Sequence, residues 1–134
     1  MGMKVGLWID HRKAVIVTLT DRGEKIDTVQ SGAERQLRRS GESPLRGPFD
    51  VLHVPADTVR QRAFTSRMNV FYDSIVTDIQ AADAVLIMGP SEAREELKKR
   101  MQRNGLVRII AGVEKAGRMT NRQIAAKVRR YFAV

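Results

Sequence analysis

The sequence predicts an α/β fold with a mixed β-sheet, in which three antiparallel strands are followed by two parallel strands and three helices flank the sheet. Three short segments rich in Val, Ile, Thr and Trp come first and are separated only by tight turns, which is typical of an antiparallel meander. Two later apolar segments alternate with stretches of helical period, which indicates parallel strands joined by crossover helices. A chain of 134 residues, 43% of them hydrophobic, has the size of one ordinary domain, so we expect a single domain over residues 1–134.

The three antiparallel strands are expected at Val5–Ile9, Ala14–Leu19 and Lys25–Gln30. Asp10 follows the first strand, and an aspartate that opens a short turn accepts backbone N–H groups two positions further along the chain. Gly23 precedes the third strand, where a hairpin often needs the positive φ that glycine adopts readily. Both turns therefore favour direct antiparallel pairing.

A long mobile loop is expected after the meander, over about residues 31–49. This stretch, SGAERQLRRSGESPLRGPF, contains three glycines and two prolines and has no sustained apolar period, although residues 34–39 can form one helical turn. Loops of this length in compact domains are usually either functional or disordered, and both alternatives stay open.

The second half of the chain begins with a long helix, expected from Asp57 to about Ala81. Apolar side chains recur near every fourth position from Val59 to Ile79, which is the period of one helix face. The uninterrupted apolar run AVLIMG, residues 84–89, then predicts a strand that is buried on both faces, at the parallel centre of the sheet.

One more helix and one more strand follow. Ser91 is expected to cap the helix, which ends at the Asn-Gly pair of residues 104–105. The segment LVRIIAGV, residues 106–113, predicts the last strand.

The last helix has the clearest local signature. Thr120 and Gln123 have the spacing of a capping box, and Met119 and Ile124 have that of a hydrophobic staple. The side chains expected to face the sheet are Ile124, Val128 and Phe132.

Positive charge is concentrated in the last third of the chain. The formal net charge is +9, but the residues up to Ser91 carry 12 basic and 11 acidic side chains, whereas those from Glu92 onward carry 12 and 4. This asymmetry favours an acidic partner, of which nucleic acid is the commonest, although a merely solvated basic surface has the same composition. Because aromatic residues make up only 5% of the chain, contacts to the shape and backbone of structured RNA are favoured over base stacking.

Nine basic residues are the candidate nucleic-acid contacts. They lie in the long loop or outside the apolar rows of the last two helices, and arginine can bridge phosphates in a bidentate manner. The candidates are Arg35, Arg38, Arg39, Arg46, Lys98, Arg122, Lys127, Arg129 and Arg130.

Composition excludes several other kinds of site. The chain has no cysteine, which excludes disulfides, thiolate zinc sites and a cysteine nucleophile. It has only two histidines, so no histidine metal cluster is expected, and His53 in its short apolar run is interpreted as structural. We therefore expect no catalytic residue, no metal and no cofactor. Without a secretory leader or an apolar run of membrane-spanning length, a cytoplasmic protein with no membrane partner is expected.

Three stretches carry a resemblance to known proteins: LWIDHRKAVIV, VLIMGPSEAREELKKR and MTNRQIAAKVRRYF. They resemble short bacterial translational machinery proteins and, with the order of elements, the middle domain of eukaryotic and archaeal class-1 release factors and pelota. The resemblance spans Val5 to Phe132 and implies a ribonuclease-H-like fold with a ribosome- or RNA-associated role. Release factors of this class carry Gly-Gly-Gln in the loop after the third strand; this sequence does not, so peptide release is not carried over to Gln36.

Three functions are compatible with these observations. The leading hypothesis is a non-enzymatic module that binds the ribosome or another structured RNA. The second is a Mg²⁺-dependent nuclease or esterase built around Asp10, but such chemistry needs several converging carboxylates, and Asp73 and Asp78 fall on different faces of their helix. The third is a homo-oligomeric interaction protein, such as a homodimer, that binds no RNA. Asp10 and His11 themselves are interpreted first as turn residues, and second as RNA contacts together with Arg12 and Lys13.

Overall fold

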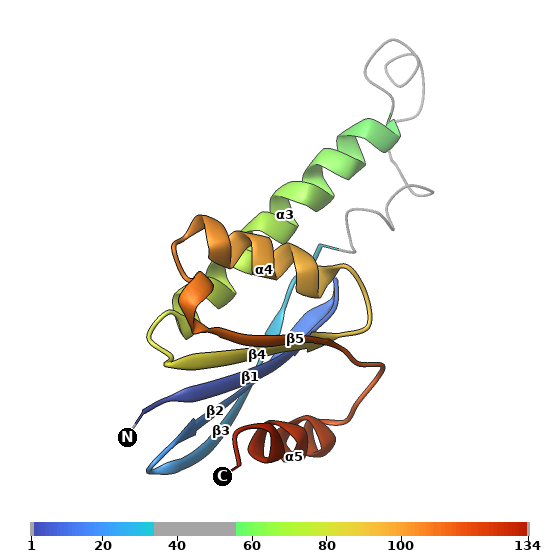
Figure 1. The fold of residues 1–134 in the computed structure, drawn as a ribbon. Helices are drawn as coiled ribbons and strands as arrows, with labels where there is room; N and C mark the ends of the chain where they lie inside the picture. The colour runs from blue at the N-terminus through green and yellow to red at the C-terminus, as the bar shows by residue number, and fades with distance from the viewer. Residues whose placement is uncertain (1, 34–55, 134) are drawn as a thin grey trace.

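The computed structural model describes residues 2–33 and 56–133 and contains a five-stranded mixed sheet flanked by three helices (Figure 1). The strands are β1 (Lys4–Ile9), β2 (Lys13–Thr20), β3 (Gly23–Gln30), β4 (Ala84–Gly89) and β5 (Ile110–Lys115). The helices are α3 (Ala56–Ile79), α4 (Ala93–Arg103) and α5 (Asn121–Tyr131), with a short 3-10 helix η2 (Val107–Ile109).

The strand order is β3-β2-β1-β4-β5. The first three strands pair antiparallel, whereas β4 runs parallel to β1 and β5 runs parallel to β4. The predicted fold class is confirmed. The helical turn predicted at 34–39, His53 and most of the loop predicted at 31–49 lie outside the described residues.

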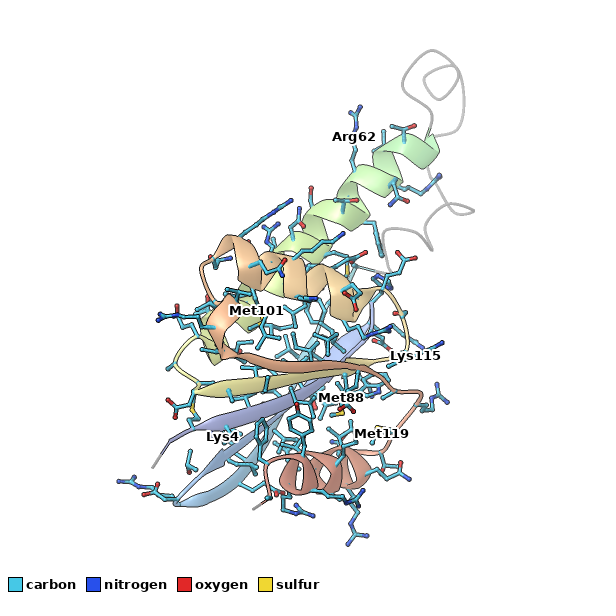
Figure 2. The ribbon with its side chains drawn as sticks, viewed as in Figure 1. Lys4, Arg62, Met88, Met101, Lys115 and Met119 are labelled. Atoms are coloured by element: carbon cyan, nitrogen blue, oxygen red, sulfur yellow. The ribbon has the colours of Figure 1, made fainter. Side chains whose placement is uncertain are left out.

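The sheet is covered on both faces, by α3 and α4 on one side and by α5 on the other (Figure 1). Successive side chains of a strand point to opposite faces, so Leu7 of β1 packs toward α3 and α4 while Trp8 packs toward α5. In Figure 2, Met101 lies between α4 and the sheet, and Met88 points from β4 toward α5. Two apolar layers therefore share one sheet.

The interior strand β4, which lies between the parallel strands β1 and β5, shows why its sequence is apolar without alternation. Every residue from Val85 to Gly89 is buried, with Ile87 in the layer beneath α3 and α4 and Leu86 in the layer beneath α5. A strand with both faces covered has no solvent side on which polar residues could alternate. The predicted buried parallel strand is confirmed.

Two predicted glycine positions have the expected backbone conformation. Gly23, where β3 begins, has a φ of +130°, and Gly105, just after α4, has a φ of +73°. Both values lie in the region that side chains with a Cβ rarely adopt. The hairpin between β2 and β3 and the end of α4 were thus predicted correctly.

The prediction that Ser91 caps α4 is wrong. The N-cap residue is Glu92, whose φ of −65° and ψ of −17° are already helical and whose side chain makes no capping hydrogen bond. A capping side chain needs an extended backbone at the cap, and the chain does not provide one here. Within the described part of the chain the buried Ser91 hydroxyl has no hydrogen-bond partner. The Arg94 guanidinium instead donates to the carbonyl oxygens of Gly89 and Ser91, at 3.1 and 2.9 Å.

The last strand begins at Ile110 and not at Leu106 as predicted. The backbone N–H of Leu106 donates to the carbonyl of Met101 at 2.9 Å, and Val107–Ile109 form the 3-10 turn. The segment is still bound to the end of α4, so it cannot yet pair with β4.

The apolar row predicted on α3 is buried over only part of its length. Phe71, Ile75 and Ile79 are buried, but Val59 is 53% exposed. The N-terminal part of α3 extends beyond the sheet, which therefore offers that part no surface to pack on (Figure 1). None of the helices in the described ranges is both long and apolar enough to span a membrane.

Among the described residues, β3 is an edge of the sheet. It pairs there with β2 on one side only, and each of its residues except Val29 is exposed. Its sequence GEKIDTVQ places Glu24, Lys25 and Asp27 along this edge, and Lys25 and Asp27 lie 3.6 Å apart as an ion pair.

Candidate nucleic-acid interface

Helix α5 is fixed to the sheet at its start and along its inner side. The Thr120 hydroxyl accepts the Gln123 N–H at 3.2 Å, and the Gln123 side chain accepts the Thr120 N–H at 2.8 Å, so the predicted capping box is confirmed. Ile124, Ala125 and Val128 are buried against side chains of β1, β2 and β4. The other side of α5 therefore faces outward in a defined orientation.

The close approach of α5 depends on a glycine in β1. A Cβ added to Gly6 would lie 2.2 Å from Cγ2 of Val128, far inside normal contact distance. The Trp8 indole N–H also donates to the carbonyl of Gly117, at 2.9 Å, and so fixes the chain just before α5. The packing of α5 therefore depends on two residues of β1.

The outer side of α5 and the turn before it are basic. The segment from Lys115 to the C-terminus contains six basic and no acidic residues. Two of the six are paired within the described structure: Lys127 contacts Glu114 at 3.0 Å, and Arg129 contacts Glu24. The other four are exposed and form no ion pair with described residues; we call them the α5 surface. They are Lys115, Arg118, Arg122 and Arg130.

The structure separates the predicted contacts into groups. Lys98 lies on α4, which covers the opposite face of the sheet from α5, so it does not join Arg122 and Arg130 in one surface. Four more candidates lie outside the described residues. They are Arg35, Arg38, Arg39 and Arg46.

Sequence reasoning missed two members of the α5 surface. Lys115 and Arg118 precede the helix, so they were not found among the polar positions of an amphipathic helix. The signal that could have found them is the unbroken absence of acidic residues after Glu114.

The Asp10 side chain performs the turn role predicted for it. Its Oδ1 accepts the backbone N–H groups of Arg12 at 2.8 Å and Lys13 at 2.9 Å. Among the described residues no group of three His, Asp or Glu side chains is placed to hold a metal ion. The described geometry therefore gives no support to a two-metal nuclease site at Asp10.

Replacing Asp10 with alanine is expected to lower the free energy of unfolding by about 1 kcal/mol, because two backbone donors lose their acceptor but remain within reach of water. Asp10→Asn keeps one acceptor oxygen and should cost less. Urea unfolding measures both. If the turn is the whole role of Asp10, wild type and Asp10→Asn incubated with labelled RNA and Mg²⁺ will cleave equally, at background; cleavage by wild type alone would contradict it.

Comparison with known proteins shows similarity in fold alone. No protein-family model matches the sequence, and no curated protein matches it significantly. Among solved structures, Pelota of Thermoplasma acidophilum superposes with a TM-score of 0.55 at 18% identity, over 99% of this chain and 32% of that one. The archaeal translation termination factor aRF1 gives 0.57 at 10% identity, over 98% and 35%. Pelota of Archaeoglobus fulgidus gives 0.55 at 10% identity, over 96% and 31%.

This chain spans about a third of the length of these solved proteins. The fold expected from the resemblance to pelota and release factors is thus confirmed, because nearly the whole chain superposes on them.

Proposed function

We propose that this chain is a non-enzymatic module that docks on the ribosome or another structured RNA, in a role related to translation. The observation that carries the proposal is the α5 surface, where four exposed cations without described ion-pair partners surround a capped, well-packed helix. The shared fold with pelota and an archaeal translation termination factor supports the context of translation.

The chemistry of the α5 surface suits the sugar-phosphate backbone. Arginine offers planar, bidentate donors to phosphate oxygens, and exposed cations that replace condensed counterions supply affinity without sequence readout. Arg122 and Arg130 are eight residues apart, about 12 Å along the helix axis, so they reach separate phosphates. A rigid helix holds them there without a large loss of backbone entropy on binding.

The remaining candidate nucleic-acid contacts have weaker or supplementary roles in RNA binding. Lys127 and Arg129 bind phosphate only in competition with Glu114 and Glu24. We further propose that the loop arginines add contacts to the same RNA, and that the protein acts in the cytoplasm. The loop arginines are Arg35, Arg38, Arg39 and Arg46.

Neutralising the α5 surface is expected to weaken RNA binding and to reduce its salt dependence. Filter-binding titrations of wild type with ribosomes and ribosomal RNA should give an affinity that falls steeply as salt rises. The double variant Arg122→Ala/Arg130→Ala should bind more weakly, with a salt slope lower by up to roughly two, one for each lost phosphate contact.

The matched control is Arg22→Ala/Arg108→Ala, which removes the same charge from exposed residues outside the α5 surface. It should bind almost as wild type does. Equal weakening by both double variants would mean that net charge alone acts. No binding at low salt, together with a dimer in light scattering, would instead favour the homo-oligomeric interaction protein.

A further inference from the structure

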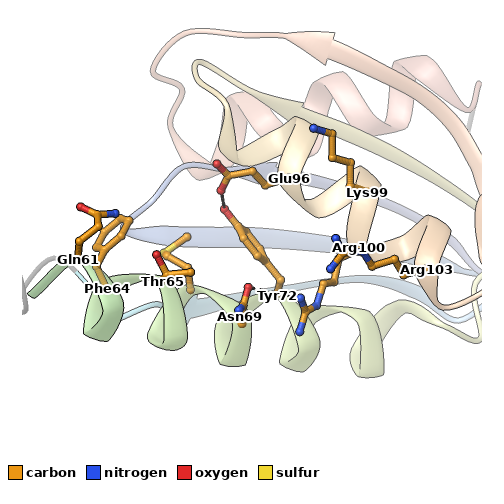
Figure 3. Close-up of a pocket in the computed structure, with 10 residues that line it drawn as sticks. Gln61, Phe64, Thr65, Asn69, Tyr72, Glu96, Lys99, Arg100 and Arg103 are labelled. Carbon is orange, nitrogen blue, oxygen red and sulfur yellow. Dashed lines mark hydrogen bonds between the residues drawn. The ribbon is translucent and has the colours of Figure 1, made fainter. Parts of the chain in front are cut away.

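A groove runs between α3 and α4, on the opposite face of the sheet from the α5 surface (Figure 3). Its volume is about 270 Å³, and the apolar part of its lining comes from Phe64, Met68 and Tyr72 of α3. Met68 and Tyr72 are buried, whereas Phe64 is only partly buried and lies at the less covered end of α3. Phe64, whose ring centroid also lies 6.0 Å from that of His11, is therefore the aromatic side chain of the groove that a flat ligand can reach.

Glu96, the acidic residue among the described lining of the groove, is already engaged. The Tyr72 hydroxyl donates to the Glu96 carboxylate, and His11 Nε2 lies 3.5 Å from Oε1 of the same carboxylate. Burial, followed by the hydrogen bond and the charge of Glu96, raises the pKa of Tyr72 far above its ordinary value, so the hydroxyl stays a donor. Glu96 is thus held by Tyr72 on one wall, as the dashed line in Figure 3 shows.

One of the three cations among the described lining residues of the groove is also engaged. The Arg100 guanidinium donates to both carboxylate oxygens of Asp73, at 2.7 and 2.9 Å, and to the Asn69 side chain at 3.4 Å. The hydrogen bond from Arg100 holds the pKa of Asp73 below its usual range and raises that of Arg100. Arg100 is therefore a fixed, neutralised part of the wall.

The remaining two cations of the groove are available. Lys99 and Arg103 are exposed, form no ion pair with described residues, and lie four residues apart, on one side of α4. Across from them α3 presents the polar side chains of Gln61 and Thr65, and residues 58–72 include no acidic side chain. The groove thus joins two cations, an aromatic ring and neutral hydrogen-bonding groups.

We propose that this groove binds a single-stranded RNA segment of two to three nucleotides along its length. Lys99 and Arg103 take a phosphate toward one end, and a base of the same segment lies against Phe64 toward the other end, where Gln61 and Thr65 hydrogen-bond to its edge. The volume is just below the about 300–1,000 Å³ typical of small-molecule sites, which fits one base and a phosphate contact better than a large cofactor. This site is separate from the α5 surface and does not depend on it.

The test is fluorescence anisotropy with a labelled adenylate hexamer, too short to form a structured RNA, added to the full chain at constant low salt. Lys99→Ala and Arg103→Ala should each weaken binding about tenfold, because each removes a charged contact to phosphate. Arg108→Ala, which removes one exposed charge outside the groove, should have little effect. Arg122→Ala/Arg130→Ala should weaken hexamer binding less than either groove variant does and should weaken ribosomal RNA binding more, and this contrast separates the site from the proposed function.

The contact between the base and Phe64 is tested by changing the protein and, separately, by changing the RNA. Phe64→Leu should weaken hexamer binding by about 5- to 150-fold, the range of one lost base–aromatic stack. A hexamer with abasic sites should bind wild type as weakly, which tests the contact without altering the fold. Free AMP should compete only at much higher concentration than the hexamer. Equal binding of normal and abasic hexamers, or competition by AMP as strong as by the hexamer, would overturn the proposal.

Discussion

Gly6→Ala is expected to lower the free energy of unfolding by about 1–3 kcal/mol, the usual cost of overpacking a core. Backbone propensity alone has the opposite sign, since alanine in a strand is normally better than glycine by about 0.5–1 kcal/mol. The steric clash outweighs the gain in backbone propensity, because the new Cβ would lie 2.2 Å from Cγ2 and 2.7 Å from Cγ1 of Val128. Val128 is a branched side chain with few alternative rotamers. Urea unfolding followed by tryptophan fluorescence measures the change, with Trp8 as the natural probe on the same face.

Removing the obstructing methyl groups should relieve the clash, although Val128→Ala also costs stability of its own because Val128 is buried. In the double variant Gly6→Ala/Val128→Ala the two changes compensate, so its destabilisation should be less than the sum of the single ones by about 0.5–3 kcal/mol. RNA affinity should show the same compensation between the two changes as stability does, because a displacement of α5 also displaces the α5 surface. Strict additivity of the two changes would show that β1 and α5 do not approach as closely as described.

Leu97→Ala is expected to have the largest effect of any single change considered, a loss of about 2–5 kcal/mol in the free energy of unfolding. Leu97 is 0% exposed and lies in the apolar layer between α4 and the sheet, where truncation leaves a cavity. Thermal and urea unfolding both measure it.

The neighbouring Lys98→Ala is the control for this change. Lys98 is only partly buried and forms no ion pair with described residues, so its removal should alter stability by less than about 0.5 kcal/mol. If Leu97→Ala cost no more than Lys98→Ala, α4 would not be anchored by its apolar row.

The features predicted correctly from the sequence are those coded locally. The capping box of Thr120 and Gln123 involves residues three positions apart, and Asp10 bonds to backbone groups within three residues. The uninterrupted apolar run of β4 likewise indicates a strand buried on both faces from its own residues alone. Each of these depends on a short segment whose physical chemistry is nearly independent of the rest.

What the sequence did not reveal depends on distant segments. Arg129 pairs with Glu24, 105 positions away, and Tyr72 bonds to Glu96 across two helices, with no local signal for either. The separation of Lys98 from the basic residues of α5 likewise depends on which face of the sheet each crossover takes. Local patterns do not encode that choice, so the groove between α3 and α4 was not predicted.

The exposed edge strand β3 bears on whether a second copy of this chain could extend the sheet by strand addition. An unpaired strand edge offers a row of free N–H and C=O groups to any other strand, which is a common route to aggregation. On β3 charge opposes this, because Glu24, Lys25 and Asp27 alternate in sign along the edge. A second copy of the chain that added a strand here would have to desolvate all three charged side chains. Glu24 is in addition bound by Arg129, so α5 holds one of these charges in place. The charges of β3 therefore act as gatekeepers, which oppose the growth of the sheet by strand addition while the interior and α5 determine the fold.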